Sequence, residues 1–350
     1  MRWAVLGTGQ IAHDFTIAML AAPKEQIVAV ASRALERSKE FAEKHNVPKA
    51  YGSYDEALED PEVDIVYVAA ATSCHVQLAC AALGKKKPVL VEKPAGVNAR
   101  EVRQLLETAQ KNDTFLMEGV WMHFFPVVRA LSDAMKRGDI GDITSVHASF
   151  GWMNPVDVNP GVEDVTQGGG GLLAVGIYLI HLAMLAFNGA KPEKVEAVGE
   201  LGPKGGDVRT SMVLGWSGGR QAMLAVSLRD NYAGSAVIYG TKAKISIPFP
   251  FLCPTSATVE PYDPKEMPTS ISEGLPCAEA TTNAAGELIS NKFNLINSAG
   301  LAYEANRVAA DVSQGKKENE HVSHELSLAV IEVMDKVREK IGLCYPADKY

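Results

Sequence analysis

A short apolar strand that runs directly into a glycine pattern is the feature that most constrains how this chain can fold. Trp3-Ala4-Val5-Leu6 is apolar, and Gly7-Thr8-Gly9-Gln10-Ile11-Ala12 follows it and opens an amphipathic helix. This is G-x-G-x-x-A between a strand and a helix, the setting that gives the pattern its meaning. Gly7 permits the tight turn, Gly9 lets the backbone approach a pyrophosphate, and the N–H groups at the helix start hold the anion. The pattern predicts dinucleotide binding, by Gly7, Gly9, Gln10 and Ile11.

The end of the second strand indicates which dinucleotide is preferred. The apolar run Ile27 to Ala31 is followed by Ser32 and Arg33, with Arg37 one helical turn further on. A fold that prefers NAD usually carries an acidic residue here for the ribose 2′-hydroxyl. A hydroxyl and two guanidinium groups bind a 2′-phosphate instead. We interpret the site as one for NADP; the alternative is that both arginines merely decorate a helix start.

A second apolar strand ends in charged residues. Pro88 to Val91 reads as a buried strand, and Glu92-Lys93-Pro94 follows it. Ligands of open α/β sheets bind beyond the carboxyl ends of the strands. Pro94 pushes Lys93 towards an extended backbone, which holds the ammonium in a set direction. Lys93 is thus a candidate cation or acid at a ligand site, although a solvated turn after the strand is the simpler alternative.

Strands and helices alternate throughout residues 1–122, which predicts a parallel sheet with right-handed crossovers. The further elements are a helix from Leu35 to His45, a short helix that Ser53 caps, and strands from Asp64 to Ala70 and from Thr114 to Glu118. The polar residues that follow the strands should meet at the edge that holds the glycine loop. These residues are Thr72, His75, Glu92 and Lys93.

The rhythm changes in residues 123–350, which we predict to be a second, α+β domain. Five strand-like runs lie between Lys194 and Ile247, and they predict an open, largely antiparallel or mixed sheet. Residues 248–297 are rich in Pro, Ser, Thr and Gly and are expected to be a long surface loop, and helices are expected at Gly300–Ser313 and Ser323–Ile341. One face of the sheet needs a helix or a second subunit to cover it, so a homodimer through this sheet is expected. The fold class is therefore α/β, a Rossmann domain followed by an α+β domain.

Two polar side chains stand out in the apolar helix that follows Gly168-Gly169-Gly170-Gly171. Tyr178 and His181 lie three residues apart and share a helix face. A tyrosine in a buried helix normally finds a partner for its hydroxyl. The residues alone leave an alternative open, in which the Tyr178 hydroxyl reaches the surface and His181 is a satisfied core histidine.

Composition excludes several classes of function. The 350 residues are 47% hydrophobic with a net charge of −8, and no basic cluster is long enough for a nucleic-acid footprint. The sequence contains no run of 18 apolar residues, so no membrane span is expected. The five cysteines are odd in number and form no C-x-x-C pair, which argues against a metal site or a disulfide framework and favours a reducing cytosol. We expect a cytoplasmic protein that binds a small molecule.

The motifs together resemble a known family. With Gly7 to Ala12, Glu92-Lys93-Pro94 and Gly176-Ile177-Tyr178 in this order and spacing, the chain resembles the glucose–fructose oxidoreductase and inositol dehydrogenase (Gfo/Idh/MocA) family. The shared texture runs nearly end to end and includes EFAEKHNVPKAYGSYDEAL and KIGLCYPADKY. The resemblance implies hydride transfer between NADP and a sugar such as D-xylose, at a CH–OH group, or a cyclic trans-dihydrodiol, at a CH–CH group.

The resemblance also implies roles for single residues. Tyr178 would be the general acid/base on the substrate hydroxyl, and Lys93 would lower its pKa and orient the ribose or substrate. His75 would lie near the cofactor. Two positions depart from the family pattern, because Ala174 stands where an aspartate is usual and His123 where an arginine is usual. His181 could take over part of the lost role.

These two departures keep other functions open. A non-catalytic NADP(H)-binding sensor or regulator would retain the fold without the missing polar pair. A reductase for a different carbonyl or a tetrapyrrole-like acceptor is a third possibility, because a fold does not determine its substrate.

Overall fold

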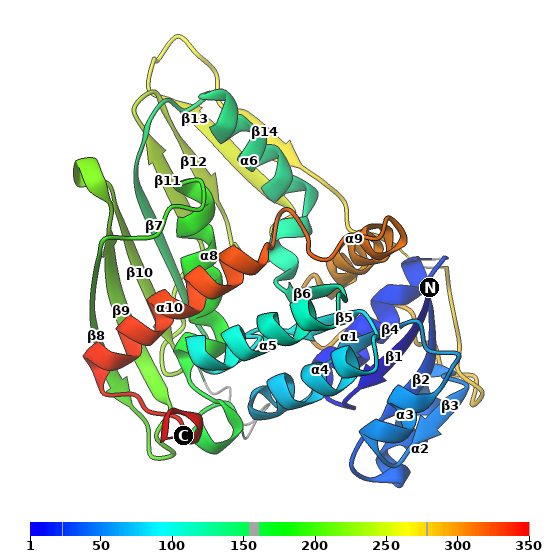
Figure 1. Ribbon diagram of the computed structural model, residues 1–350. Helices are drawn as coiled ribbons and strands as arrows, with labels where there is room; N and C mark the ends of the chain where they lie inside the picture. Colours follow the sequence, from blue (N-terminus) through cyan, green and yellow to red (C-terminus); the bar gives the residue numbers. More distant parts are fainter. Residues whose placement is uncertain (23, 154–160, 278, 350) are drawn as a thin grey trace. The chain divides into compact units, whose positions relative to one another are not determined.

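The computed structural model describes residues 1–350 apart from residues 23, 154–160, 278 and 350 (Figure 1). The chain divides into two compact units. The first comprises Met1–Gly96, Arg100–Phe124 and Leu275–His324, and the second comprises Val97–Ala99, Phe125–Gly274 and Glu325–Tyr350. A parallel sheet forms the first unit and a mixed, largely antiparallel sheet the second, which confirms the predicted fold class.

The sheet of the first unit has six parallel strands in the order β3-β2-β1-β4-β5-β6. The strands are β1 (Arg2–Leu6), β2 (Gln26–Ala31), β3 (Lys49–Tyr51), β4 (Ile65–Val68), β5 (Val89–Glu92) and β6 (Leu116–Gly119). Residues Val89 to Val91 are fully buried, as expected of a parallel strand covered on both faces. The strand order reverses beside β1, so the carboxyl ends of β1 and β4 flank a topological switch point, where such sheets bind ligands.

Six helices of the described residues belong to the first unit, and α2 has the bounds that the sequence predicts. They are α1 (Gln10–Ala18), α2 (Leu35–His45), α3 (Tyr54–Glu59), α4 (His75–Gly84), α5 (Ala99–Lys111, from Arg100 onward in this unit) and α9 (Leu301–Ser313), with short turns η1 (Met19–Ala21), η2 (Thr72–Cys74), η3 (Trp121–Phe124) and η7 (Ser298–Gly300). Ser53 accepts a hydrogen bond from the Glu56 N–H at 3.3 Å, which confirms it as the N-cap of α3. No helix among the described residues is long and apolar enough to cross a membrane.

The sheet of the second unit has eight strands in the order β14-β13-β12-β11-β7-β10-β9-β8. The strands are β7 (Ile143–Gly151), β8 (Lys194–Leu201), β9 (Asp207–Gly215), β10 (Gln221–Ser227), β11 (Ala236–Gly240), β12 (Ala243–Ile247), β13 (Ser256–Pro261) and β14 (Thr269–Ser272). Strands β7 and β10 pair in parallel, and the other neighbours pair antiparallel. The sheet is thus mixed.

Helices pack on one face of this sheet, and no helix of the described residues covers the other face, called the open face below (Figure 1). They are α6 (Pro126–Arg137), α8 (Ile177–Ala186) and α10 (His324–Ile341, from Glu325 onward in this unit), with a π-helical turn η5 (Leu172–Gly176) leading into α8 and the short turns η4 (Val165–Gln167), η6 (Ser217–Gly219) and η8 (Pro346–Lys349). Helix α8 contacts β7 and β10, and burial alternates along β9 to β12. On the open face Val198, Val213 and Met223 are 79%, 44% and 41% exposed.

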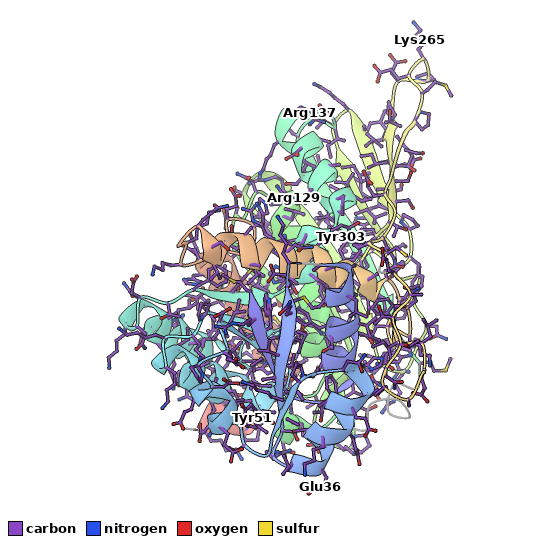
Figure 2. The ribbon with its side chains drawn as sticks, turned by 90° about the vertical axis from the view of Figure 1, so that its right-hand side faces the viewer. Glu36, Tyr51, Arg129, Arg137, Lys265 and Tyr303 are labelled. Carbon is purple, nitrogen blue, oxygen red and sulfur yellow. The ribbon has the colours of Figure 1, made fainter. Side chains whose placement is uncertain are left out.

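The prediction of a continuous loop over residues 248–297 was wrong. Strands β13 and β14 form an antiparallel hairpin within it and extend the sheet beyond β12. The turn between them carries Lys265 (Figure 2). Prolines and serines around both strands masked their short alternation. Pairing of β13 with β12, and of β14 with β13, supplies the order that their local preference lacks. The sequence analysis also missed the short strand β3, whose three residues pair with β2.

Candidate cofactor and catalytic residues

The glycine loop has the geometry that a dinucleotide requires. Gly7 has φ +126°, and a Cβ atom there would lie 2.3 Å from the carbonyl oxygen of Ala69, so no other residue fits. A Cβ atom at Gly9 would meet nothing within 4 Å, so the backbone faces open space. Gly9 is also the N-cap of α1 and brings no side chain to compete for the N–H groups of the first turn. The loop therefore leaves room for a pyrophosphate at Gly9 and Gln10, and Ile11, the next residue of the helix, is half-buried.

Two exposed arginines lie beyond the carboxyl end of β2. Arg33 follows the strand and Arg37 lies in α2. Burial raises the pKa of Tyr54, and both guanidinium groups oppose this rise, so both lie within electrostatic reach of one hydroxyl. Ser32 is buried, and its hydroxyl donates to the carbonyl of Ala34 at 2.8 Å. The two arginines thus carry exposed positive charge, whereas the Ser32 hydroxyl is engaged within the turn.

The charged pair at the end of β5 is not a solvated turn. Glu92 is 6% exposed and accepts a hydrogen bond of 2.6 Å from the hydroxyl of Tyr67. Burial raises the pKa of Glu92, against the positive charge of Lys93. Lys93 is half-buried, and burial lowers its pKa, against the carboxylates of Glu92 and Glu118. The ammonium therefore depends on these carboxylates to remain charged.

His75 joins the ends of two strands. Its Nδ1 lies 2.8 Å from the carbonyl oxygen of Pro94 and its Nε2 lies 3.1 Å from that of Ala70. A neutral imidazole donates through one of these nitrogens, and burial lowers the pKa of His75. The ring is 2% exposed and holds the backbone directly after Lys93. Thr72, in the turn before it, is half-buried.

Two further carboxyl groups belong to this neighbourhood and were missed in the sequence. Glu118 lies at the end of β6 and accepts a hydrogen bond of 2.8 Å from the Ala95 N–H. Glu304 in α9 is fully buried, and neither carboxyl oxygen has a hydrogen-bond partner among the described residues. Burial raises the pKa of Glu304 well above its usual value, and the charges of Glu92 and Glu118 add to the effect. In the sequence, Glu118 follows an apolar run as Glu92 does, and this pattern could have identified it as a site residue. No sequence pattern marks Glu304.

The remaining candidates lie on other elements. Tyr178 in α8 is 6% exposed and His181 is fully buried, and both belong to the second unit. Ala174 is half-buried in the π-helical turn before them. His123 lies in η3 of the first unit and is 1% exposed. Tyr178 thus lies in a buried, apolar helix directly after an irregular turn of the kind often found at functional sites.

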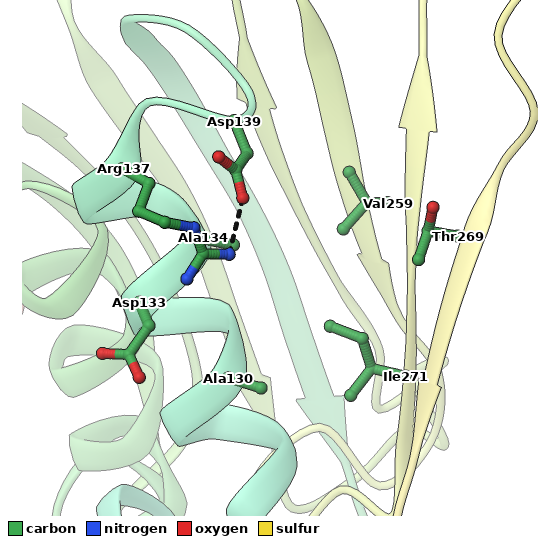
Figure 3. Close-up of a pocket in the computed structure, with 8 residues that line it drawn as sticks. All are labelled: Ala130, Asp133, Ala134, Arg137, Asp139, Val259, Thr269 and Ile271. Carbon is green, nitrogen blue, oxygen red and sulfur yellow. Dashed lines mark hydrogen bonds and ion pairs between the residues drawn. The ribbon is translucent and has the colours of Figure 1, made fainter.

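A cleft of about 390 Å³ lies in the second unit between α6 and the β13–β14 hairpin (Figure 3). Arg137 and Asp139 form an ion pair of 2.6 Å at one side of it, and Val259 and Ile271 lie on the other (Figure 3). None of the candidate residues lines this cleft. We therefore do not assign the reaction to it.

Comparison with known proteins agrees with this arrangement. Residues 1–120 match the model of an oxidoreductase family with an NAD-binding Rossmann fold, and residues 128–246 match the Gfo/Idh/MocA C-terminal domain. Curated relatives named trans-1,2-dihydrobenzene-1,2-diol dehydrogenase include one from Danio rerio, 37% identical over 99% of both chains. Another, from Sus scrofa, is 37% identical over 100% of this chain and 99% of its own.

Solved structures share the fold over almost the whole chain. A 3-ketoreductase from Actinomadura kijaniata, in complex with NADP and TDP-benzene, has a TM-score of 0.78 at 25% identity and covers 97% of this chain and 98% of its own. A levoglucosan dehydrogenase, in complex with NADH and levoglucosan, has a TM-score of 0.82 at 17% identity and covers 98% and 97%. The family resemblance of the motifs is confirmed, and this chain belongs to the Gfo/Idh/MocA family of oxidoreductases with an NAD(P)-binding Rossmann fold.

Proposed function

We propose that this chain is an NADP-dependent oxidoreductase that transfers a hydride between NADP(H) and a sugar such as D-xylose or an alicyclic trans-dihydrodiol. The observation that carries the proposal is Lys93, half-buried beside the buried Glu92 at the carboxyl end of β5, in the unit that holds the open backbone at Gly9. The full-length relatives named trans-1,2-dihydrobenzene-1,2-diol dehydrogenase support a dihydrodiol as substrate. A sugar as substrate is in keeping with the structural neighbour in complex with levoglucosan.

The preference for NADP over NAD rests on Arg33 and Arg37. Both are exposed beyond β2, where an acidic residue would repel a 2′-phosphate. Both guanidinium groups act electrostatically on one hydroxyl, that of Tyr54, and two positive charges in the same region suit a dianion. A neighbour in complex with NADP supports the same preference.

Tyr178 is the proposed general acid/base. When bound, the cofactor accepts the hydride from the substrate carbon during oxidation. The proton of the substrate hydroxyl passes to the Tyr178 oxygen, and in reduction this proton returns to the carbonyl oxygen. A tyrosine of ordinary pKa, about 10, is a poor base at neutral pH, so a nearby ammonium is needed, which we assign to Lys93. His181, one turn from Tyr178, is proposed to assist in orienting it.

The competing function is a non-catalytic NADP(H) sensor. It rests on Ala174 and His123, which supply neither a carboxylate nor a guanidinium where the family has both. The retained Lys93 and Tyr178 favour the enzyme.

The test is NADPH formation with pentoses, hexoses and cyclic diols, compared for NADP and NAD. Tyr178→Phe should lower kcat by about 10²–10⁴-fold, the usual contribution of an acid/base group. Tyr239→Phe is the matched control, because Tyr239 is a half-buried tyrosine on β11 of the same unit. A His181→Ala variant with an unchanged rate would remove His181 from the mechanism. Tight NADP binding without turnover on any substrate would favour the sensor.

We also propose a homodimer formed through the open sheet face and a cytosolic location. Exposed apolar side chains on a broad sheet face are typical of a covered interface. All five cysteines are free thiols, which suits a reducing compartment.

A further inference from the structure

The helical segment that carries Tyr178 begins on a carboxylate from the sheet. The Leu172 N–H donates to Asp207 at 2.9 Å to Oδ2 and 3.1 Å to Oδ1. Asp207 is the first residue of β9 and is fully buried. The first N–H groups of a helix have no partner within the helix, and negative charge there interacts favourably with the helix dipole. One side chain thus ties the start of this helix to the sheet, across 35 positions of sequence.

The carboxylate is itself held in place. The Thr210 hydroxyl donates to its Oδ2 at 2.7 Å. Gly170 has φ +135°, and a Cβ atom there would lie 2.4 Å from Oδ1 of Asp207 and 3.1 Å from the hydroxyl of Tyr345. That hydroxyl donates to the carbonyl of Gly169 at 2.9 Å. The turn before the helix is therefore fitted against Asp207 and Tyr345 at once.

The helix between Asp207 and Tyr178 is irregular. Residues Leu172 to Gly176 form a π-helical turn, and α8 continues from Ile177. A Cβ atom at Gly176 would lie 3.1 Å from a methyl carbon of Leu172, so this turn is tightly packed. A shift of one residue in helix phase rotates a side chain by about 100°. The point at which the helix starts therefore decides the direction in which the ring of Tyr178 projects.

We propose that Asp207 is a positioning residue for Tyr178, because its carboxylate fixes the first turn of the helix on the sheet and so sets the direction of the tyrosine hydroxyl. This inference rests on the proposed function, in which Tyr178 is the acid/base. Asp207 is fully buried and acts through the helix, without touching the substrate.

The charge of Asp207 supplies a second signature. Burial raises the pKa of Asp207 to about 6, against the hydrogen bonds from Thr210 and Leu172. The carboxylate cap is therefore complete above this pH and is lost as the pH falls through it. Titratable and charged groups on the elements around it include Tyr345, His181, the ion pair Glu163–Arg229, and Arg209 with its two partners Asp230 and Glu200. Tyr345 has a pKa well above its usual value because it is buried, and Glu163 and Asp230 have lowered pKa values because of their arginines.

The test compares Asp207→Asn with Thr210→Val in the full-length chain. Asp207→Asn keeps the shape and removes the charge, whereas Thr210→Val removes one supporting bond and leaves the cap. Amide hydrogen exchange of Leu172–Tyr178 should be faster in Asp207→Asn, with a smaller change in Thr210→Val. The amide keeps only one acceptor oxygen for the Leu172 N–H and carries no negative charge for the start of the helix. The dissociation constant of NADP should stay unchanged while kcat falls, and the acid limb of kcat near pH 6 should disappear in Asp207→Asn but persist in His181→Ala.

Unchanged exchange in this segment together with unchanged kcat in Asp207→Asn would overturn the proposal. If Asp207→Asn does not fold, Thr210→Val decides, and it must then raise exchange in Leu172–Tyr178 more than in β10. Failure of the proposed function is seen separately, as activity retained in Tyr178→Phe. An inactive Tyr178→Phe beside a fully active Asp207→Asn would refute the positioning role alone.

Discussion

The hydroxyl of Tyr67 donates a hydrogen bond of 2.6 Å to Oε1 of Glu92, the residue that precedes Lys93. This bond favours the ionised form of Glu92, whose pKa burial raises. The charge of Glu92 in turn supports the ammonium of Lys93, whose pKa burial lowers. A core tyrosine of β4 therefore acts on the proposed site through a carboxylate.

Glu92→Gln should shift the alkaline limb of the kcat/KM profile to lower pH. Removing the carboxylate leaves burial to lower the pKa of Lys93 further, so the ammonium is lost earlier as pH rises. Tyr67→Phe should shift the limb in the same direction by less, because it weakens the charge on Glu92 without removing it. The pH dependence of kcat/KM measures both, and an alkaline limb that stays in place in Glu92→Gln would show that Lys93 does not depend on this carboxylate.

Arg33→Ala should weaken NADP binding by about 10–100-fold, the cost of one charge-assisted hydrogen bond to a buried or partly buried phosphate. NAD binding should change little, because NAD has no 2′-phosphate. Titration calorimetry with both cofactors measures the change, and Lys39→Ala, which removes an exposed cation on α2, is the control. Equal losses for NADP and NAD would mean that Arg33 supports the fold of the loop and does not bind the 2′-phosphate.

Two buried acids of α9 should respond to pH in opposite ways. Glu304 has a raised pKa, so its contribution to stability is complete below the unfolded-state pKa and is lost as pH rises. The stability of Glu304→Gln relative to the wild type should therefore rise between about pH 5 and pH 8. The difference in the free energy of unfolding should grow by up to about 1.4 kcal/mol per pH unit until the folded-state pKa of Glu304 is reached. Urea midpoints across this range measure the difference. A difference that does not vary with pH would mean that Glu304 is ionised in the folded protein.

Asp311 on the same helix is the matched opposite. Burial alone would raise its pKa, but Lys316 at 2.9 Å, Asn319 and Arg307 together lower it. Its contribution is present above the unfolded-state pKa and is lost as pH falls. Asp311→Asn should lower the free energy of unfolding by about 1–3 kcal/mol at neutral pH, because Lys316 and Arg307 lose their negative partner. The loss should shrink in acid, because protonation of Asp311 removes the same charge from the wild type.

The open sheet face should hold two copies together. Val213→Lys or Met223→Lys places a charge on this face and should convert a wild-type dimer to a monomer, since a buried unpaired charge is costly. Met267→Lys is the control, because Met267 is 82% exposed in the turn between β13 and β14 and away from this face. Light scattering or sedimentation gives the mass, and a monomeric wild type would refute the interface.

The sequence by itself determined most of the parallel sheet of the first unit and the helices between its strands. The glycine pattern, the apolar strands and the E-K-P turn are local signals, and α2 begins and ends at Leu35 and His45 as its pattern predicts. Parallel strands buried on both faces leave an almost continuous apolar run that is hard to misread. Carboxyl-end residues such as Lys93 followed from the topology that such runs impose.

Only the tertiary structure decided the remaining features, because they depend on contacts between distant segments. The cap that Asp207 provides for Leu172 joins a strand to a helix across 35 positions, and no local pattern marks it. Glu304 reaches the neighbourhood of Glu92 through α9, more than two hundred positions later in the chain, where it looks like an ordinary helical glutamate. Strand β13 forms by pairing with β12, and β14 by pairing with β13, and neither forms by its own preference. Burial and non-local hydrogen bonds, which no sequence window contains, set the charges and directions of these groups.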